Sequence, residues 1–207
     1  VLHTLSFQLA QIAGRSFVLE LNIAKALGEL EGQTPEERFI SFIEKKFVGY
    51  KQLVSFFSEY AVISRTLTER TMLFVNVIKE TLDRYLLNRS MIIDTFSLHS
   101  SELIRIDAGF GDSHQQGRSV MRLYLANGQS FMYKPKPLDI SLHFQELIQW
   151  FNDKGFSPFL QRNSVIALDG YGYEKFIEAK PCKTEEEIQC FYTRLGALLA
   201  IIYLLDG

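Results

Sequence analysis

Apolar residues recur at helical spacing through the first half of the chain, which predicts a run of helices. One helical face of apolar residues extends over residues 4–27. The segment Thr34-Pro35-Glu36-Glu37 has the capping-box pattern with proline at the first helical position, so a helix is predicted to begin there and to continue to Phe47. A shorter helix is predicted over residues 51–57, and a long amphipathic one over residues 61–88.

The apolar period shortens to two after residue 98, which indicates strands. Three strands are predicted over residues 103–107, 118–125 and 129–134. The last two are joined by Asn127-Gly128, a strong signal for a tight hairpin.

A second set of elements follows these strands. Asp139 is predicted to cap a helix over residues 139–154, with Ile140 on its apolar face and Gly155 after its last turn. The remaining predicted elements are two strands, over 164–168 and 173–177, and an apolar helix over 185–205 that opens with a second capping box at Thr184 and Glu187.

The predicted fold class is therefore α+β, with a helical region followed by a five-stranded antiparallel sheet. Three strands, a helix, two strands and a long helix are also the element order of a kinase small lobe followed by one large-lobe helix, although any α+β domain could share it. The predicted domains are a helical region (1–98), a kinase-like small lobe (99–183) and a first large-lobe helix (184–207).

Composition is that of an ordinary folded domain. With 47% hydrophobic residues and a net charge of −2, nothing drives the chain toward nucleic acid or an anionic membrane. No stretch of about 18 apolar residues is free of charge, and no basic region opens a signal peptide, so we expect a cytoplasmic protein without a spanning helix. Cys182 and Cys190 lack metal-ligand spacing, and no metal-binding residues are expected within this chain.

Lys134 is the first candidate for chemistry. It ends a predicted strand, and Pro135 after it favours an extended backbone. In a kinase-like lobe such a lysine binds the α- and β-phosphates of a nucleotide and pairs with a glutamate of the next helix, where Glu146 is the one glutamate available. The alternative is that both charges are solvated, where such a pair contributes about 0–1 kcal/mol.

A glycine-rich segment between the first two predicted strands is the second candidate. Gly109, Gly111 and Gly117 would let backbone N–H groups approach a phosphate closely, and Arg118 could bind the same phosphate in a bidentate manner. The third glycine, however, comes three residues later than in the kinase pattern G-x-G-x-x-G.

The extra residues of this segment include Asp112 and His114. A histidine beside a phosphate could move a proton, and an aspartate could orient it. A polar surface turn in which Asp112 bonds its own backbone explains the same residues without catalysis.

Several motifs together resemble the dehydratase domain of class II lanthipeptide synthetases. They are GDSHQQGRSV (111–120), FMYKPKPLDI (131–140), HFQELIQWFNDKGF (143–156), YGYEKFIEAKPC (171–182) and FYTRLGALLAIIYLLDG (191–207). The resemblance implies a fold similar to lipid kinases. It also implies an enzyme that uses ATP and Mg²⁺ to phosphorylate Ser and Thr of a precursor peptide with a leader, then eliminates phosphate to give dehydroalanine and dehydrobutyrine. Through these motifs, Lys134 inherits the ATP-phosphate role, and Asp112 and His114 inherit active-site roles.

The chain also departs from that family. The catalytic loop, the metal-binding aspartate and the zinc-dependent cyclase domain of such enzymes have no counterpart in these 207 residues. We therefore expect a fragment without turnover of its own, whose Mg²⁺ ligands lie elsewhere and whose last helix exposes an apolar face that favours self-association. Two alternatives stay open, namely another kinase-like phosphotransferase acting on a lipid, sugar or antibiotic, and a non-catalytic module that binds nucleotide or peptide.

Overall fold

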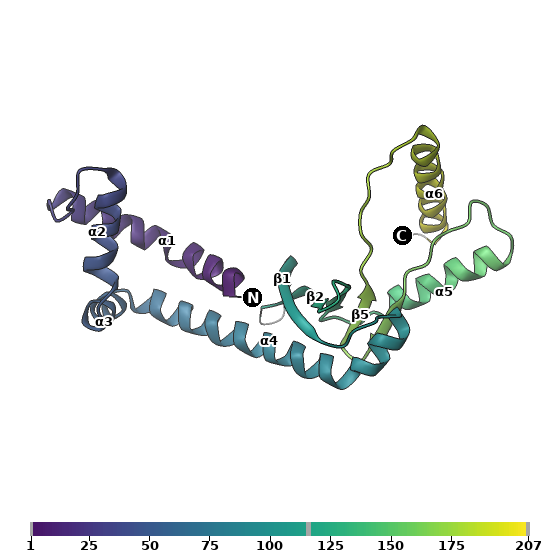
Figure 1. Cartoon of the computed structure of the whole chain (residues 1–207), viewed down its shortest axis with the longest axis horizontal. Helices are drawn as coiled ribbons and strands as arrows, with labels where there is room; N and C mark the ends of the chain where they lie inside the picture. Colours follow the sequence, from purple (N-terminus) through teal and green to yellow (C-terminus); the bar gives the residue numbers. More distant parts are fainter. Residues whose placement is uncertain (1, 115–116, 206–207) are drawn as a thin grey trace. The chain divides into compact units, whose positions relative to one another are not determined.

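The computed structural model describes residues 2–114 and 117–205, with the side chains of residues 111–114 not described. The chain divides into two compact units, one of residues 1–82 with 114–117, and one of residues 83–113 with 118–207. The order of elements is a set of helices followed by a five-stranded antiparallel sheet and further helices (Figure 1). The predicted α+β class is confirmed.

The first unit is helical. It contains α1 (Leu2–Ala26), α2 (Pro35–Phe47), α3 (Tyr50–Glu59) and the first part of α4 (Ala61–Phe96). The predicted capping box at the start of α2 is confirmed, because the Thr34 hydroxyl accepts from Glu37 N at 3.1 Å and the Glu37 carboxylate accepts from Thr34 N at 3.1 Å. Local sequence alone therefore sets this helix boundary.

An aromatic cluster forms the core of the first unit. Phe17 contacts both Phe47 and Phe56, and the Phe17–Phe47 and Phe47–Phe56 pairs meet edge to face with centroids 4.9 and 5.0 Å apart. Phe42 and Phe56 are buried. Edge-to-face pairs of this kind add to the stabilisation from area burial, so α1, α2 and α3 are held as one body.

The second unit is built on one sheet in the order β1-β2-β3-β5-β4. The strands are β1 (Leu103–His114), β2 (Arg118–Leu125), β3 (Ser130–Lys134), β4 (Val165–Leu168) and β5 (Tyr171–Lys175). Buried and half-buried residues alternate without exception along β2 and β3, as predicted from the apolar period of two. The buried set includes Met121, Leu123, Leu125, Phe131, Tyr133 and Tyr173.

The last part of α4 covers this buried face. Tyr85 stacks on Phe131 at 5.8 Å, and Ile92 and Phe96 have 0% and 1% of their surface exposed. The helix therefore continues eight residues beyond the predicted end at residue 88, because Ile92 and Phe96, four residues apart on one face, both pack against the sheet.

The start of α5 (Asp139–Asp153) differs from the prediction. Leu138, not Asp139, occupies the N-cap position and makes no side-chain capping bond, while Asp139 lies in the first turn, where its charge still suits the helix dipole. Leu138 is 1% exposed and packs over Gly172. The prediction that Ile140 faces the core is wrong, since it is 87% exposed.

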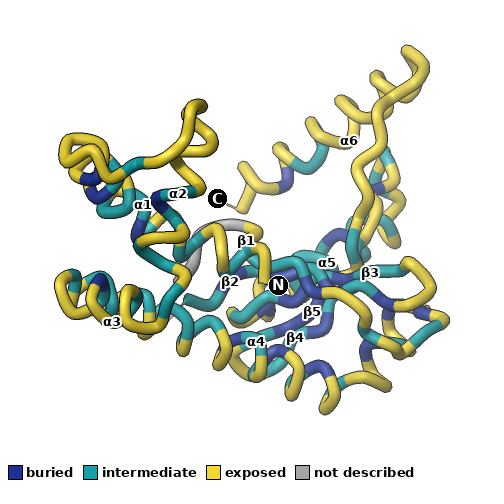
Figure 2. Tube along the Cα trace, turned by 60° about the vertical axis from the view of Figure 1, so that its left-hand side comes forward, coloured by how far each residue is buried: buried dark blue, intermediate teal, exposed yellow. Residues whose placement is uncertain are grey.

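The last helix, α6 (Glu185–Leu204), contacts the rest of the second unit through only one face. Ala197, Leu198 and Ile201 pack against α5, and most other residues of the helix are exposed (Figure 2). Thr184 caps the helix by accepting from Glu187 N, but the Glu187 carboxylate accepts from Lys183 N, so only half of the predicted capping box is present.

Within the described residues, α6 is the one helix that is long and apolar enough to cross a membrane by length and composition. The expectation of no spanning helix rested on the lack of a charge-free apolar stretch. Arg194 interrupts the apolar stretch of α6, but the mean hydropathy of the helix is still high enough for a spanning segment. Core helices of soluble proteins reach such values as well.

Candidate functional site

Lys134 lies at the end of β3, on the face of the sheet opposite the α4-covered core. Its neighbours Tyr133 and Phe131 point to the buried face, so the alternation of the strand turns Lys134 to the other side. Its side chain is 25% exposed, which leaves the ammonium accessible to a ligand while its stem is packed.

The partner of Lys134 is Glu174 on β5. The ammonium lies 2.6 Å from the Glu174 carboxylate, whose side chain is 15% exposed. Lys134 is opposite Gly172 in the ladder, and Glu174 is two residues further on the same face. The two side chains are therefore diagonal cross-strand neighbours, a separation that long charged side chains span easily.

The predicted pairing of Lys134 with Glu146 is wrong in this structure. Glu146 lies on the exposed side of α5, where its carboxylate is 3.0 Å from Nδ1 of His143. The helix turns Glu146 toward solvent because the buried position of α5 is Ile148. The cofactor-binding role of Glu146 remains a prediction.

Gly109 belongs to a strand rather than to the predicted loop. The expected loop of residues 109–117 is wrong for its first part, because β1 continues to His114. Ladder hydrogen bonds come from the backbone, so glycines are tolerated in an edge strand. Gly109 has a φ of +93° and donates its N–H to the Ser119 hydroxyl at 3.2 Å, beside the start of β2.

The antiparallel order brings several predicted site residues to one end of the sheet. Met121 pairs with Tyr133, so the start of β2 adjoins the end of β3. Gly109 and Lys134 therefore lie on either side of the start of β2, where Arg118 is the first, half-buried residue. This juxtaposition is the one that a phosphate site would need.

The other residues of the glycine-rich segment are only partly described. Gly117 has a φ of +86°, a conformation that favours glycine. The backbone of Gly111, Asp112 and His114 belongs to β1, but their side chains lie outside the described structure. The roles predicted for these three residues therefore stay predictions.

Aromatic and cationic side chains lie on the same face of the sheet as Lys134. The Arg122 guanidinium lies 3.3 Å from the centroid of the Phe176 ring and donates to the Ser130 hydroxyl. Met132, half-buried between these groups and Lys134, pairs across the ladder with Glu174. This face therefore carries Met132 and Phe176 together with the cations of Lys134 and Arg122.

The connector after β5 offers backbone groups to a ligand. The backbone of Lys175 is still hydrogen-bonded to the segment before β4, since its N–H donates to the Ser164 carbonyl and its carbonyl accepts from the Asn163 amide. From residue 176 to residue 182, no backbone group has a hydrogen-bond partner within the described part of the chain. Such groups can donate to and accept from the edge of an adenine ring.

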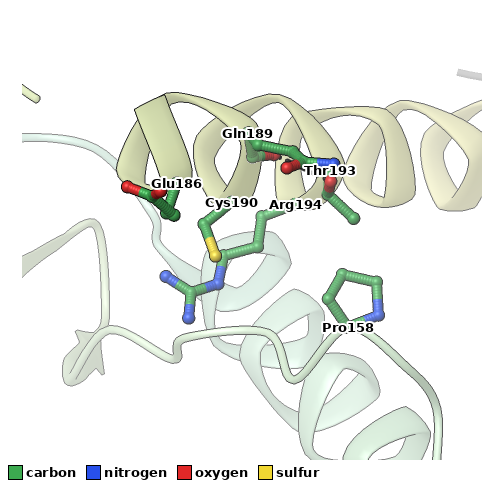
Figure 3. Close-up of a pocket in the computed structure, with 6 residues that line it drawn as sticks. All are labelled: Pro158, Glu186, Gln189, Cys190, Thr193 and Arg194. Atoms are coloured by element: carbon green, nitrogen blue, oxygen red, sulfur yellow. Dashed lines mark hydrogen bonds between the residues drawn. The ribbon is translucent and has the colours of Figure 1, made fainter. Parts of the chain in front are cut away.

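Two cavities of the second unit lie beside α6. A cavity of about 270 Å³ is bounded by Pro158 and by Glu186, Cys190 and Arg194 of α6 (Figure 3). A larger one, of about 720 Å³, lies between α5 and α6 and includes Ile177 of the connector. Neither of these two cavities includes Lys134.

No group of three or more histidine, cysteine, aspartate or glutamate side chains gathers at a metal-binding distance in the described residues. Cys182 and Cys190 are free thiols on the surface.

Comparison with known families gives a match over most of the chain. Residues 60–207 match the domain of unknown function DUF4135. The matched region includes all of α4, the whole sheet with Lys134 and Glu174, and α6, whereas α1, α2 and α3 lie outside it.

A relative of recorded role covers nearly the whole chain. The lacticin 481/lactococcin biosynthesis protein of Lactococcus lactis subsp. lactis is 23% identical over 203 residues, which is 94% of this chain. The chain spans 22% of the length of that relative. The similarity is low in identity but continuous through both units.

Proposed function

We propose that the chain provides the nucleotide-binding lobe of a peptide dehydratase. It belongs to the DUF4135 family, and its match to a lantibiotic biosynthesis protein confirms the resemblance to class II lanthipeptide synthetases. The substrate is a ribosomal precursor peptide, and the phosphate donor is ATP. The peptide substrate extends the match from the relative to this chain, and ATP is what the resemblance to the synthetase family implies.

The Lys134–Glu174 pair is the observation that carries this proposal. A lysine at a strand end, held by a carboxylate 2.6 Å away and 25% exposed, is oriented before any ligand binds. An oriented ammonium loses less conformational entropy when it binds phosphate oxygens than a free surface lysine does. The connector after β5 adds backbone groups that have no hydrogen-bond partner within the described residues.

In the proposed phosphorylation step, the hydroxyl oxygen of a peptide Ser or Thr attacks the γ-phosphorus. The new P–O bond forms as the bond from phosphorus to the β–γ bridging oxygen breaks, ADP leaves, and the hydroxyl proton passes to a base or to water. Lys134 binds the phosphate oxygens and stabilises the negative charge that develops on the leaving group.

In the proposed elimination step, a base removes the α-proton of the phosphorylated residue. The electron pair forms the Cα–Cβ double bond, and the Cβ–O bond breaks to release phosphate. The resemblance implies active-site roles for Asp112 and His114, and His114 is the group able to carry the proton.

Nucleotide binding to the 207-residue chain tests the proposal. Titration calorimetry with ADP and ATP, with and without Mg²⁺, should show binding that Lys134→Ala weakens at least tenfold. Lys136→Ala is the matched control, because Lys136 is exposed two residues away and should leave the affinity within twofold. Equal affinities of the wild type and Lys134→Ala would contradict the proposed role.

A further inference from the structure

A cavity in the first unit has a composition that the nucleotide-binding proposal does not use. It measures about 590 Å³ and lies between the end of α1, the turn of residues 27–34 and the start of α2. Its apolar wall includes Leu21, Leu30 and Phe39, and its charged residues are Lys25 and Arg38. It lies in the part of the chain outside the DUF4135 match.

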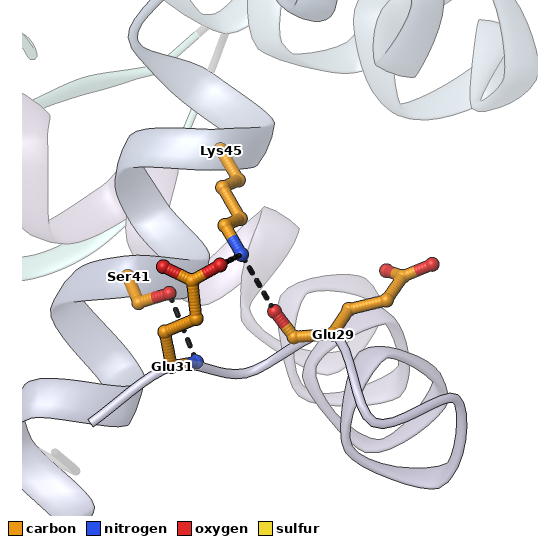
Figure 4. A network of polar contacts seen from close by, with 4 residues as sticks. All are labelled: Glu29, Glu31, Ser41 and Lys45. Carbon is orange, nitrogen blue, oxygen red and sulfur yellow. Dashed lines mark hydrogen bonds and ion pairs between the residues drawn. The ribbon is translucent and has the colours of Figure 1, made fainter.

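The turn that forms one wall is fixed by several contacts. Lys45 of α2 donates to the Glu29 carbonyl at 2.9 Å and to the Glu31 carboxylate at 2.6 Å, and the Ser41 hydroxyl accepts from Glu31 N (Figure 4). Gly32 has a φ of +126°, and a Cβ there would lie 2.4 Å from the Glu37 Cβ. The wall is therefore held in place without a ligand.

The charge of the cavity is positive. Lys25 and Arg38 make no ion pair or side-chain hydrogen bond within the described residues. Of the acids nearby, Glu31 is paired with Lys45, Glu37 accepts from the N–H groups of Gln33 and Thr34, and the exposed Glu29 and Glu36 do not line the cavity. The bonds to Glu37 and the charge of Arg38 lower the pKa of Glu37, but neither Glu31 nor Glu37 lines the cavity.

The apolar wall is exposed as well. Phe39 is 51% exposed, and Leu21 and Leu30 line the cavity beside it. An apolar concavity of this size admits one or two side chains, and two cations at its edge favour carboxylates next to them. A flat membrane surface would not fill such a concavity.

We propose that this cavity binds an acidic, amphipathic peptide segment. A leucine-sized side chain enters between Leu30 and Phe39, and neighbouring carboxylates pair with Lys25 and Arg38. That the bound segment belongs to the peptide being modified rests on the proposed function, whereas the binding itself does not.

Binding of labelled synthetic peptides to the full 207-residue chain tests this proposal. The probe is a 15-residue fluorescent peptide with a leucine stripe flanked by glutamates. Two further peptides replace the glutamates with glutamine or with lysine. Fluorescence anisotropy should show the acidic peptide binding at least tenfold more tightly than either of the other two, with an affinity that falls as salt is raised.

Charge reversal locates the site. Lys25→Glu with Arg38→Glu should weaken binding of the acidic peptide at least tenfold. The matched control is Arg15→Glu with Lys51→Glu, two exposed cations that do not line the cavity and that change net charge equally. The control should stay within twofold, and both doubles should keep the wild-type circular dichroism and unfolding midpoint.

Three results would overturn the proposal. The first is equal affinity for the three peptides, and the second is an equal loss of peptide affinity in the two double variants. The third is that Lys25→Glu with Arg38→Glu loses binding to anionic vesicles but keeps its affinity for the acidic peptide. Lys134→Ala separates this proposal from the nucleotide site, since it should weaken nucleotide binding at least tenfold and leave peptide binding unchanged.

Discussion

The phenol of Tyr60 donates a 2.7 Å hydrogen bond to the carboxylate of Glu20, which is 5% exposed inside the helical unit. Lys46 donates to the other oxygen of the same carboxylate at 3.0 Å. The hydrogen bond from Tyr60 and the charge and hydrogen bond of Lys46 lower the pKa of Glu20, although burial opposes them. The same bond raises the pKa of Tyr60 to about 12.

Replacing Glu20 with glutamine should destabilise the helical unit. The amide cannot pair with the charge of Lys46, and hydrogen bonds to charged groups contribute about 1.5–3 kcal/mol each. We expect Glu20→Gln to lower the free energy of unfolding at pH 7 by about 1–3 kcal/mol. Urea unfolding followed by circular dichroism measures this. Glu31→Gln, which removes an exposed pair with Lys45, should cost less than about 1 kcal/mol.

The free energy of unfolding should vary with pH as the shifted pKa values of Glu20 and Tyr60 require. The folded-state pKa of Glu20 lies below its ordinary value of 4.5, so its stabilisation is present above pH 4.5 and is lost as the pH falls further. The pKa of Tyr60 is raised, so its stabilisation is present below pH 10 and is lost as the pH rises toward 12. The difference between the wild type and Glu20→Gln should narrow in acid. A constant difference down to pH 3 would contradict this.

Removal of the hydroxyl should change the stability of the protein differently at two neighbouring tyrosines, Tyr133 and Tyr173. Tyr133 accepts a 2.6 Å hydrogen bond from Arg84, whereas the buried Tyr173 hydroxyl has no partner within the described residues. Both N–H groups of the nearby Asn88 amide are used, by the Arg84 carbonyl and the Tyr171 hydroxyl.

We therefore expect Tyr133→Phe to destabilise the protein by about 1–3 kcal/mol and Tyr173→Phe to be neutral or stabilising. Thermal unfolding of the two variants side by side gives the comparison. A larger loss from Tyr173→Phe than from Tyr133→Phe would show that the Tyr173 hydroxyl has a partner in solution.

A methyl group at Gly172 should disturb the sheet next to Lys134. A Cβ there would lie 2.3 Å from the Ile166 carbonyl oxygen and 2.6 Å from a methyl of Leu138. Overpacking of this kind costs about 1–3 kcal/mol. Gly196→Ala is the control, because a Cβ at Gly196 in α6 meets nothing within 4 Å and should stabilise the helix by about 0.5–1 kcal/mol. Differential scanning calorimetry distinguishes the two outcomes.

Local signals predicted much of the fold. The start of α2 follows from Thr34 and Glu37, and the buried face of β2 follows from the alternation of Met121, Leu123 and Leu125. Both depend on residues within one element. The end of α4 could not be found in the same way, because Ile92 and Phe96 extend the helix by packing on a sheet that is formed later in the chain.

The candidate site shows the same difference between local signals, which the sequence reveals, and long-range contacts, which it does not. The position of Lys134 at a strand end followed from its neighbours, but its partner did not, since Glu174 reaches it through the pairing of β3 with β5, forty residues apart in sequence. The pattern YGYEK did contain the signal. Once Gly172 is placed opposite Lys134, the glutamate two residues further must share its face.

The most direct measurement is labelling of the chain with an acyl phosphate of ATP, which transfers its acyl group to a lysine amine that contacts the phosphates. Mass spectrometry should find the label on Lys134, blocked by excess ATP, with Lys136 as an unlabelled control in the same segment. Labelling of Lys136 and Lys134 to the same extent, or labelling of Lys134 that ATP does not block, would contradict a nucleotide site at this end of the sheet.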